Sequence, residues 1–120
     1  MPILDMHLSE LKQFQGSNPC PTNIDEFRDT SVKEMEALGT SYELSKAAFQ
    51  FPGAECYDMY FVGIGGSRIH CKLARPQNMK DPLPVIYCFH SCYTSKAPDF
   101  FYLLPYVQAG FIVSAMDCRG

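Results

Sequence analysis

The stretch that decides the fold is residues 85–116, which read VIYCFHSCYTSKAPDFFYLLPYVQAGFIVSAM. Continuously apolar runs stand at both of its ends, at residues 85–89 and 111–116. Runs of this length are typical of strands that are buried on both faces of a parallel sheet. Between them, Pro98 can open a helix with apolar packing residues, and Gly110 can end it. The order strand, loop, helix, strand predicts a βαβ unit with parallel strands, which places the chain in the α/β class.

Before this unit, the hydrophobic pattern changes to a period of two. From residue 55 to Pro76, two alternating segments flank the turn-forming sequence GIGGS at residues 63–67. The alternation predicts a β-hairpin with one buried face and one wet face. The glycines do not indicate a phosphate-binding loop, because a strand rather than a helix follows them. The face that we expect to be buried carries Tyr57, Met59, Phe61, Ile69, Cys71 and Leu73.

The N-terminal third is predicted to be helical. Residues 8–14 can form a short helical turn, because apolar side chains recur on one face. A longer helix is expected to begin at Asn23, where Glu26 would complete a capping box, and to end at Gly39. Residues 42–51 leave a short helix and an irregular connection open.

These elements are expected to form a single, incomplete domain over residues 1–120. Residues 1–39 would be its N-terminal helical extension, and residues 54–120 the start of its central sheet. A sheet made only of the hairpin and the two βαβ strands would keep an exposed edge. We therefore expect this chain to be a piece of a larger α/β protein.

Composition excludes several classes of function. The net charge of −3 and the lack of any Lys/Arg run argue against a nucleic-acid partner. No apolar stretch approaches the ~20 residues of a membrane helix, and the first residues do not resemble a signal peptide. We therefore expect no membrane partner and a cytoplasmic location. The six cysteines are expected to be free, mostly buried thiols in a reducing compartment.

The loop after the first apolar run is the candidate site. In open α/β sheets, chemistry gathers at the carboxyl ends of the strands, and residues 90–94, HSCYT, follow such an end. An ordinary solvent loop is an equal alternative. Cys88, His90 and Cys92 do not indicate a metal site, because the sequence supplies no fourth ligand.

Several motifs resemble those of one enzyme family. They are MPxxDMxLxELKxF at residues 1–14, DEF at 25–27, AECYDMxFxG at 54–63, GSRI at 66–69, His90, and MDCRG at 116–120. Their order and spacing resemble the acetyl xylan esterase / cephalosporin-C deacetylase family, carbohydrate esterase family seven. The resemblance covers nearly all of the 120 residues.

This resemblance implies an α/β-hydrolase fold, of which the chain would be the N-terminal part. It also implies a serine hydrolase without a cofactor, which removes acetyl groups from xylo-oligosaccharides or cephalosporin-type esters and often assembles as a homo-oligomer. We expect no catalytic residue here, because no G-x-S-x-G occurs and none of His7, His70 and His90 can follow that serine. The chain alone is therefore expected to be inactive. The alternative is a non-catalytic truncated module for oligomer contacts or sugar binding.

The resemblance also places the expected substrate-binding residues in the oxyanion loop. His90 matches the family's H-G-Y segment, while Ser91-Cys92-Tyr93 replaces the usual Gly-Tyr-Asn. Counting without a gap places Cys92 at the family's tyrosine, and a shift of one residue places Tyr93 there. The backbone N–H of one of these two residues is expected to supply half of an oxyanion hole.

Overall fold

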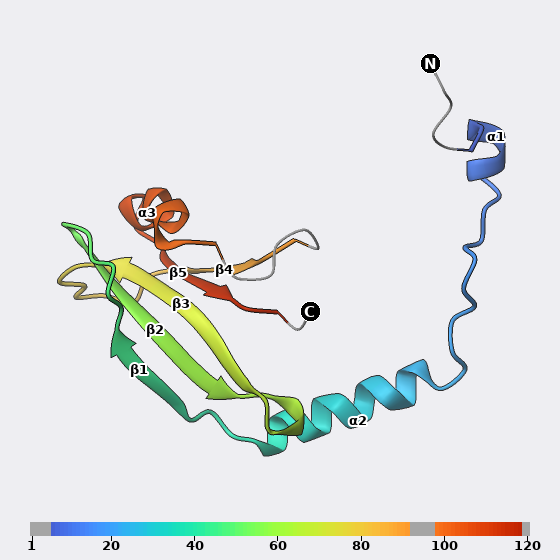
Figure 1. Ribbon diagram of the computed structural model, residues 1–120, viewed down its shortest axis with the longest axis horizontal. Helices are drawn as coiled ribbons and strands as arrows, with labels where there is room; N and C mark the ends of the chain where they lie inside the picture. The colour runs from blue at the N-terminus through green and yellow to red at the C-terminus, as the bar shows by residue number, and fades with distance from the viewer. Residues whose placement is uncertain (1–5, 92–97, 119–120) are drawn as a thin grey trace.

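A five-stranded sheet forms the body of the molecule in the computed structural model, which describes residues 6–91 and 98–118 (Figure 1). The strand order is β1-β2-β3-β5-β4, with β4 and β5 parallel and the other neighbours antiparallel. The strands are β1 (Tyr42–Lys46), β2 (Ala54–Val62), β3 (Arg68–Pro76), β4 (Val85–Phe89) and β5 (Ile112–Met116). The helical elements are α1 (Leu8–Leu11), α2 (Ile24–Ala37), the 3-10 turn η1 (Ile64–Gly66) and α3 (Phe100–Gln108).

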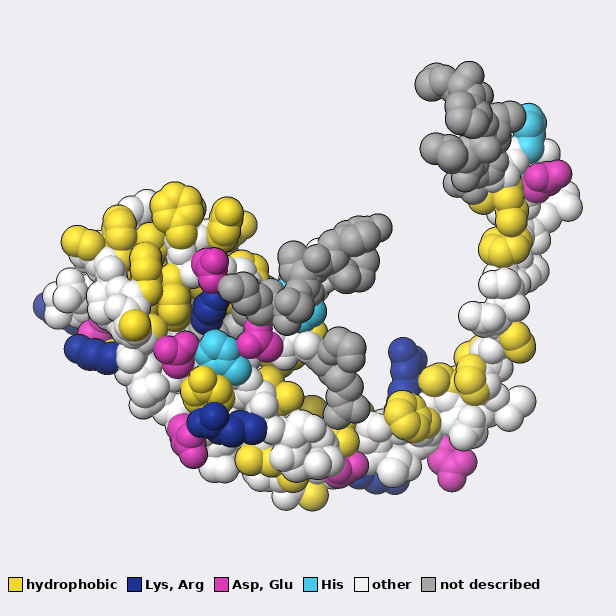
Figure 2. All heavy atoms as spheres, in the orientation of Figure 1, with side chains coloured by type: hydrophobic (Ala, Val, Ile, Leu, Met, Phe, Trp, Pro, Cys, Tyr) yellow, Lys and Arg dark blue, Asp and Glu magenta, His cyan; other side chains and the backbone are white. Residues whose placement is uncertain are grey.

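The predicted βαβ unit is confirmed. Strand β4, helix α3 and strand β5 follow one another, and the two strands lie parallel with Tyr87 opposite Ser114. Helix α3 lies over one face of the sheet, which we call the covered face (Figure 1). Figure 2 shows that apolar side chains also gather on the outer surface in the region of α3. Phe101 and Tyr102 of this helix are exposed. The core consists of Phe100, Leu103, Leu104 and Val107 of the helix against Ala54, Cys56, Ala74, Val113 and Ala115 of the sheet, together with Ala47.

The opposite face of the sheet, the open face, carries larger side chains. In strand β4, Tyr87 and Phe89 are 69% and 62% exposed on this face, whereas Ile86 and Cys88 pack against the core. The prediction that residues 85–89 are buried on both faces is therefore wrong for the described chain. Tyr87 and Phe89 stay exposed because α3 covers only one side of the sheet and because β4 is an edge strand. Strand β5, one position further in, does bury Val113, Ser114 and Ala115.

The predicted hairpin is also confirmed, but its two faces are exchanged. Strands β2 and β3 pair antiparallel around η1, where Gly65 and Gly66 have φ angles of 68° and 73° that favour glycine. The six apolar residues that we expected to be buried lie on the open face, and of these only Cys71 is buried. Helix α3 packs instead on the alternate residues, among them Cys56 and Ala74.

Residues 42–51 contain a strand, where the sequence suggested a short helix or an irregular connection. Strand β1 pairs with β2 from Tyr42 opposite Phe61 to Lys46 opposite Tyr57. All of its residues are exposed, so burial leaves no pattern in its sequence. The sheet therefore begins before residue 54, the expected start.

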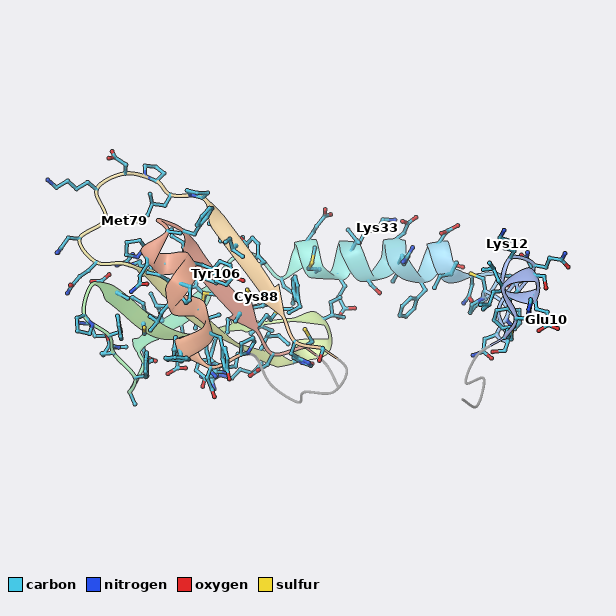
Figure 3. The ribbon with its side chains drawn as sticks, turned by 90° about the horizontal axis from the view of Figure 1, so that it is seen from above. Glu10, Lys12, Lys33, Met79, Cys88 and Tyr106 are labelled. Carbon is cyan, nitrogen blue, oxygen red and sulfur yellow. The ribbon has the colours of Figure 1, made fainter. Side chains whose placement is uncertain are left out.

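Helix α2 is confirmed, although its capping box is not. Asn23 occupies the N-cap position, but its side chain makes no capping hydrogen bond. No residue of the helix is buried, and seen from above α2 leads away from the sheet towards α1 (Figure 3). The Gly65 N–H donates to Glu34 Oε1 at 2.8 Å, which ties the helix to the hairpin turn. Among the described residues, neither α2 nor any other helix has the length and apolar character needed to cross a bilayer.

Candidate functional site

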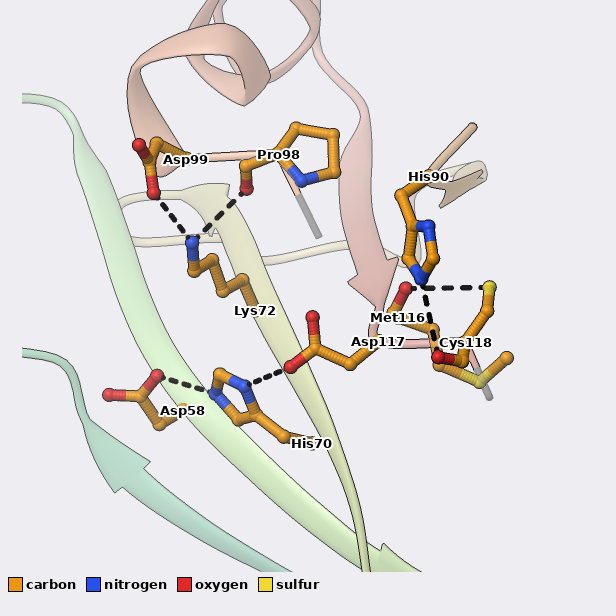
Figure 4. Close-up of polar contacts among 9 residues, drawn as sticks. All are labelled: Asp58, His70, Lys72, His90, Pro98, Asp99, Met116, Asp117 and Cys118. Atoms are coloured by element: carbon orange, nitrogen blue, oxygen red, sulfur yellow. Dashed lines mark hydrogen bonds and ion pairs between the residues drawn. The ribbon is translucent and has the colours of Figure 1, made fainter. Parts of the chain in front are cut away.

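The candidate site lies where the parallel strands β4 and β5 end. His90 follows β4, and Asp117 and Cys118 follow β5, so these residues meet at the carboxyl edge of the parallel pair. The His90 ring places Nδ1 3.0 Å from the Ser91 carbonyl oxygen. Its Nε2 lies 3.3 Å from the Cys118 carbonyl oxygen (Figure 4). The bond to the Ser91 carbonyl, followed by the bond to the Cys118 carbonyl, raises the pKa of His90. His90 therefore joins the ends of the two strands.

The two predicted substrate-binding residues, Cys92 and Tyr93, lie outside the described residues. Their assignment stays a prediction. The described residues fix the two ends of the segment that contains them. His90 holds the end next to β4 through the contact with Cys118.

Lys72 of β3 holds the other end of that segment. Its Nζ donates to Asp99 Oδ1 at 2.8 Å and lies 3.4 Å from the Pro98 carbonyl oxygen (Figure 4). It also stands 5.8 Å from the centre of the Phe100 ring. Because Asp99 is the N-cap residue of α3, Lys72 fixes the start of the helix over the covered face.

A second polar cluster lies beside the first. The His70 ring of β3 lies between two carboxylates, with Nε2 2.8 Å from Asp58 Oδ1 and Nδ1 2.9 Å from Asp117 Oδ2 (Figure 4). Tyr60 stacks on the imidazole with ring centroids 4.8 Å apart. The Asp117 N–H also donates to the His70 carbonyl at 3.0 Å. The end of β5 is thus joined to β3 by both backbone and side chain.

This second cluster has the geometry of a bridge and not of a catalytic base. A histidine that activates a nucleophile directs one ring nitrogen to the nucleophile and the other to an orienting group. Both nitrogens of His70 face carboxylates instead.

The buried cysteines do not suit nucleophilic chemistry. Cys56 and Cys71 are free and buried, and burial is the main cause that raises the pKa of both thiols. A thiol needs a lowered pKa to attack as the thiolate. Within the described residues, no group of three or more His, Cys, Asp and Glu side chains could hold a metal ion.

Sequence reasoning found His90 and missed Asp58 and Asp117 as site neighbours. The available signal was the alternation of His70 with Arg68 and Lys72, which predicted a polar face of the hairpin. The partners of His70 are 12 and 47 residues away in the chain. Only the strand register brings them together.

Comparisons with known proteins agree with one another. The model of the acetyl xylan esterase (AXE1) family matches residues 1–120. The solved structure of acetyl xylan esterase 1 from Thermoanaerobacterium sp. JW/SL YS485 has 42% identity and a TM-score of 0.82, over 97% of this chain and 36% of that one. An acetyl xylan esterase from Paenibacillus sp. R4 has 24% identity and a TM-score of 0.75, over 96% of this chain and 37% of that one, and shows the fold alone. No curated protein sequence matches the chain.

Proposed function

The chain belongs to the acetyl xylan esterase family, and from this premise we propose that the complete protein is an esterase that removes acetyl groups from carbohydrates. The chain spans about 36% of the length of the solved esterase that it resembles at 42% identity, and corresponds to its N-terminal α/β-hydrolase-like region. The observation that carries the proposal is this match together with a loop anchored at the carboxyl edge of two parallel strands.

The proposed reaction is acyl transfer to a serine. The serine oxygen attacks the acetyl carbonyl while a histidine takes its proton, and an aspartate orients that histidine. The histidine then returns the proton to the leaving sugar oxygen, and water releases acetate in a second, equivalent step. We assign all three residues to the part of the protein outside these 120 residues, because G-x-S-x-G does not occur among them.

The proposed contribution of this chain is half of the oxyanion hole. The negative oxygen of the tetrahedral intermediate needs backbone N–H donors held in place before the reaction begins. We propose that Cys92 or Tyr93 supplies one of them. The anchoring of the flanking residues, by His90 on one side and Lys72 on the other, supports this role.

The substrate is tested on the complete protein with three esters. These are a chromogenic acetate, an acetylated xylo-oligosaccharide and cephalosporin C, each followed by the release of acetate or the chromophore. Labelling by a serine-directed phosphonate tests the nucleophile. We expect turnover of the acetates, labelling of one serine, and no activity from the 120-residue chain alone. A complete protein that releases no acetate from any of the three would contradict the proposal.

The oxyanion assignment is tested by alanine and proline at residues 92 and 93. Alanine keeps the backbone N–H, so most of kcat should remain. Proline removes the donor, and the loss of one oxyanion donor typically lowers kcat about a hundred- to a thousandfold. Circular dichroism checks that each variant is folded. Near-normal kcat in both proline variants would show that neither residue is the donor.

We also propose that the complete protein is a homo-oligomer located in the cytoplasm. The apolar side chains of α2 support the proposed homo-oligomer, since Phe27 is 65% exposed and Met35 is exposed as well. The burial of free thiols at Cys56 and Cys71 supports a reducing compartment.

Light scattering of the complete protein and of a Phe27→Ser variant tests the assembly. If the 120-residue chain is a stable monomer that binds acetylated sugar by itself, the alternative of a non-catalytic module is correct.

A further inference from the structure

A series of polar contacts links neighbouring strands of the sheet from β2 through β3 and β5 to β4. Asp58 of β2 contacts His70 of β3, and His70 contacts Asp117 after β5. The next residue, Cys118, presents its carbonyl to the ring of His90 after β4. The series runs across four strands on one face of the sheet and ends at the residue that begins the oxyanion loop (Figure 4).

The first part of this series holds the His70 ring by a carboxylate at each of its two nitrogens. His70 is 23% exposed and its two carboxylate partners 31% and 33%, so water screens the contacts only in part. Both contacts are within hydrogen-bond distance, at 2.8 Å from Nε2 to Asp58 and 2.9 Å from Nδ1 to Asp117. Tyr60 lies against the imidazole, and Arg68 lies over the Tyr60 ring at 3.7 Å, which restrains the ring from the side.

The last part of the series transmits this position to the loop. Asp117 is joined to His70 by its carboxylate as well as by its backbone N–H, and the Cys118 carbonyl follows directly in the chain. His90 contacts that carbonyl, and His90 is two residues from Cys92. A shift of the Cys118 carbonyl therefore moves the anchor of the loop.

We propose that Asp58, His70 and Asp117 are positioning residues for the oxyanion loop, acting through Cys118 and His90. This inference rests on the proposed esterase function and deepens it. The oxyanion donor acts in the transition state, and a displacement of about 1 Å can cost a hundredfold in rate. Loss of the bridge therefore lowers kcat and leaves KM almost unchanged.

The experiment is a double-mutant cycle in the complete protein with His70→Gln and His90→Gln. Glutamine at residue 70 carries both of its N–H donors on one nitrogen, so it cannot span Asp58 and Asp117 as the two separate ring nitrogens do. We expect His70→Gln to lower kcat roughly ten- to a hundredfold. If His70 acts through His90, the double variant loses little more than the larger single loss. Two losses that multiply, or a change confined to KM, would overturn the inference.

Matched variants separate positioning from simple stability. Arg75→Gln breaks another ion pair between β2 and β3, that with Glu55 at 2.7 Å, on the open face and should leave kcat unchanged. Asp58→Asn, a milder change at the far end of the bridge, should give a smaller loss than His70→Gln. Added imidazole should restore part of kcat to His70→Ala. Equal loss in Arg75→Gln, or normal kcat in folded His70→Gln, would contradict the role.

A readout without substrate separates this inference from the proposed function. The nitrogen-bound ring protons of His90 report its contact with the Cys118 carbonyl in NMR spectra of the complete protein. We expect them to shift in His70→Gln and to stay in place in Arg75→Gln. A wild type without esterase activity would overturn the proposed function, and unshifted His90 resonances in His70→Gln would overturn the positioning role.

Discussion

The two faces of the sheet differ in the size of the side chains that they present. The covered face meets α3 with alanine, cysteine and valine, and Val113 and Ala115 are fully buried there. The open face presents tyrosine, methionine and phenylalanine, of which Tyr87 and Phe89 in β4 stay mostly exposed. Small residues let a helix approach the strands closely, whereas large residues fill more space and need a more distant cover.

This difference shows that the apolar content of a sheet face does not by itself decide whether that face is buried. The cover of the first face is local in sequence, because α3 connects the two strands on which it packs. No comparable helix among the described residues packs on the second face. Its exposed apolar side chains form the kind of surface that proteins cover with another element. We therefore expect the remainder of the protein to pack there.

The largest expected effect comes from placing a charge on the covered face. Val113→Asp would bury an unpaired carboxylate at a position with no exposure. Such a charge costs several kcal/mol, and whole domains are stable by about 5–15 kcal/mol, so we expect no folded protein. Soluble yield and circular dichroism of the complete protein check this. A folded Val113→Asp variant with the wild-type urea midpoint would show that this face is not a core.

A smaller effect tests whether the open face is covered. Tyr87→Ser in the complete protein should lower the free energy of unfolding by roughly 1.5–3 kcal/mol if the remainder of the chain buries Tyr87. The exposed Tyr102→Ser on the outer surface of α3 serves as the comparison and should change it by less than about 0.5 kcal/mol. Urea unfolding measures both. Equal midpoints for the two variants would mean that the open face stays in water.

The smallest effect concerns the ion pair of Glu55 and Arg75 on the open face. A hydrogen bond from Arg75 is the main cause that holds the pKa of Glu55 below its ordinary value. A lowered pKa in the folded state contributes stability above the unfolded value, and this stability is lost as the pH falls through the folded value. Glu55→Gln should therefore cost about 0.2–1 kcal/mol at neutral pH and nothing in strong acid. Urea unfolding over a pH series measures the difference, and a difference independent of pH would contradict this account.

The sequence predicted helices and strands well where the hydrophobic periodicity is strong. It failed where contacts with other elements decide the structure of a segment or the face that is buried. The βαβ unit and the hairpin follow from apolar runs and alternation. Strand β1 was missed because all of its side chains are exposed and its pairing with β2 alone makes it a strand. The buried face of the hairpin was assigned by side-chain size, yet α3 packs on the smaller residues.

The sequence likewise predicted one part of the candidate site and missed another. His90 could be predicted because it comes directly after an apolar strand, and α/β sheets place their sites at the carboxyl ends of strands. The bridge through His70 could not be found in this way. It needs the register of β2, β3 and β5 together, and Asp117 reaches His70 only because β5 is placed between β3 and β4.

The strand order also bears on how the protein is made. Strand β3 pairs with β5, so on the ribosome one edge of β3 has no partner until residues 77–116 have been synthesised. During that interval the N–H and C=O groups on this edge of β3 can pair with a wrong strand. Strand β4 is the first candidate, because it leaves the ribosome before β5. A translational pause inside α3 would lengthen this interval, whereas rapid synthesis through β5 would shorten it. Codon choice between residues 98 and 116 is therefore expected to influence the yield of correctly paired sheet.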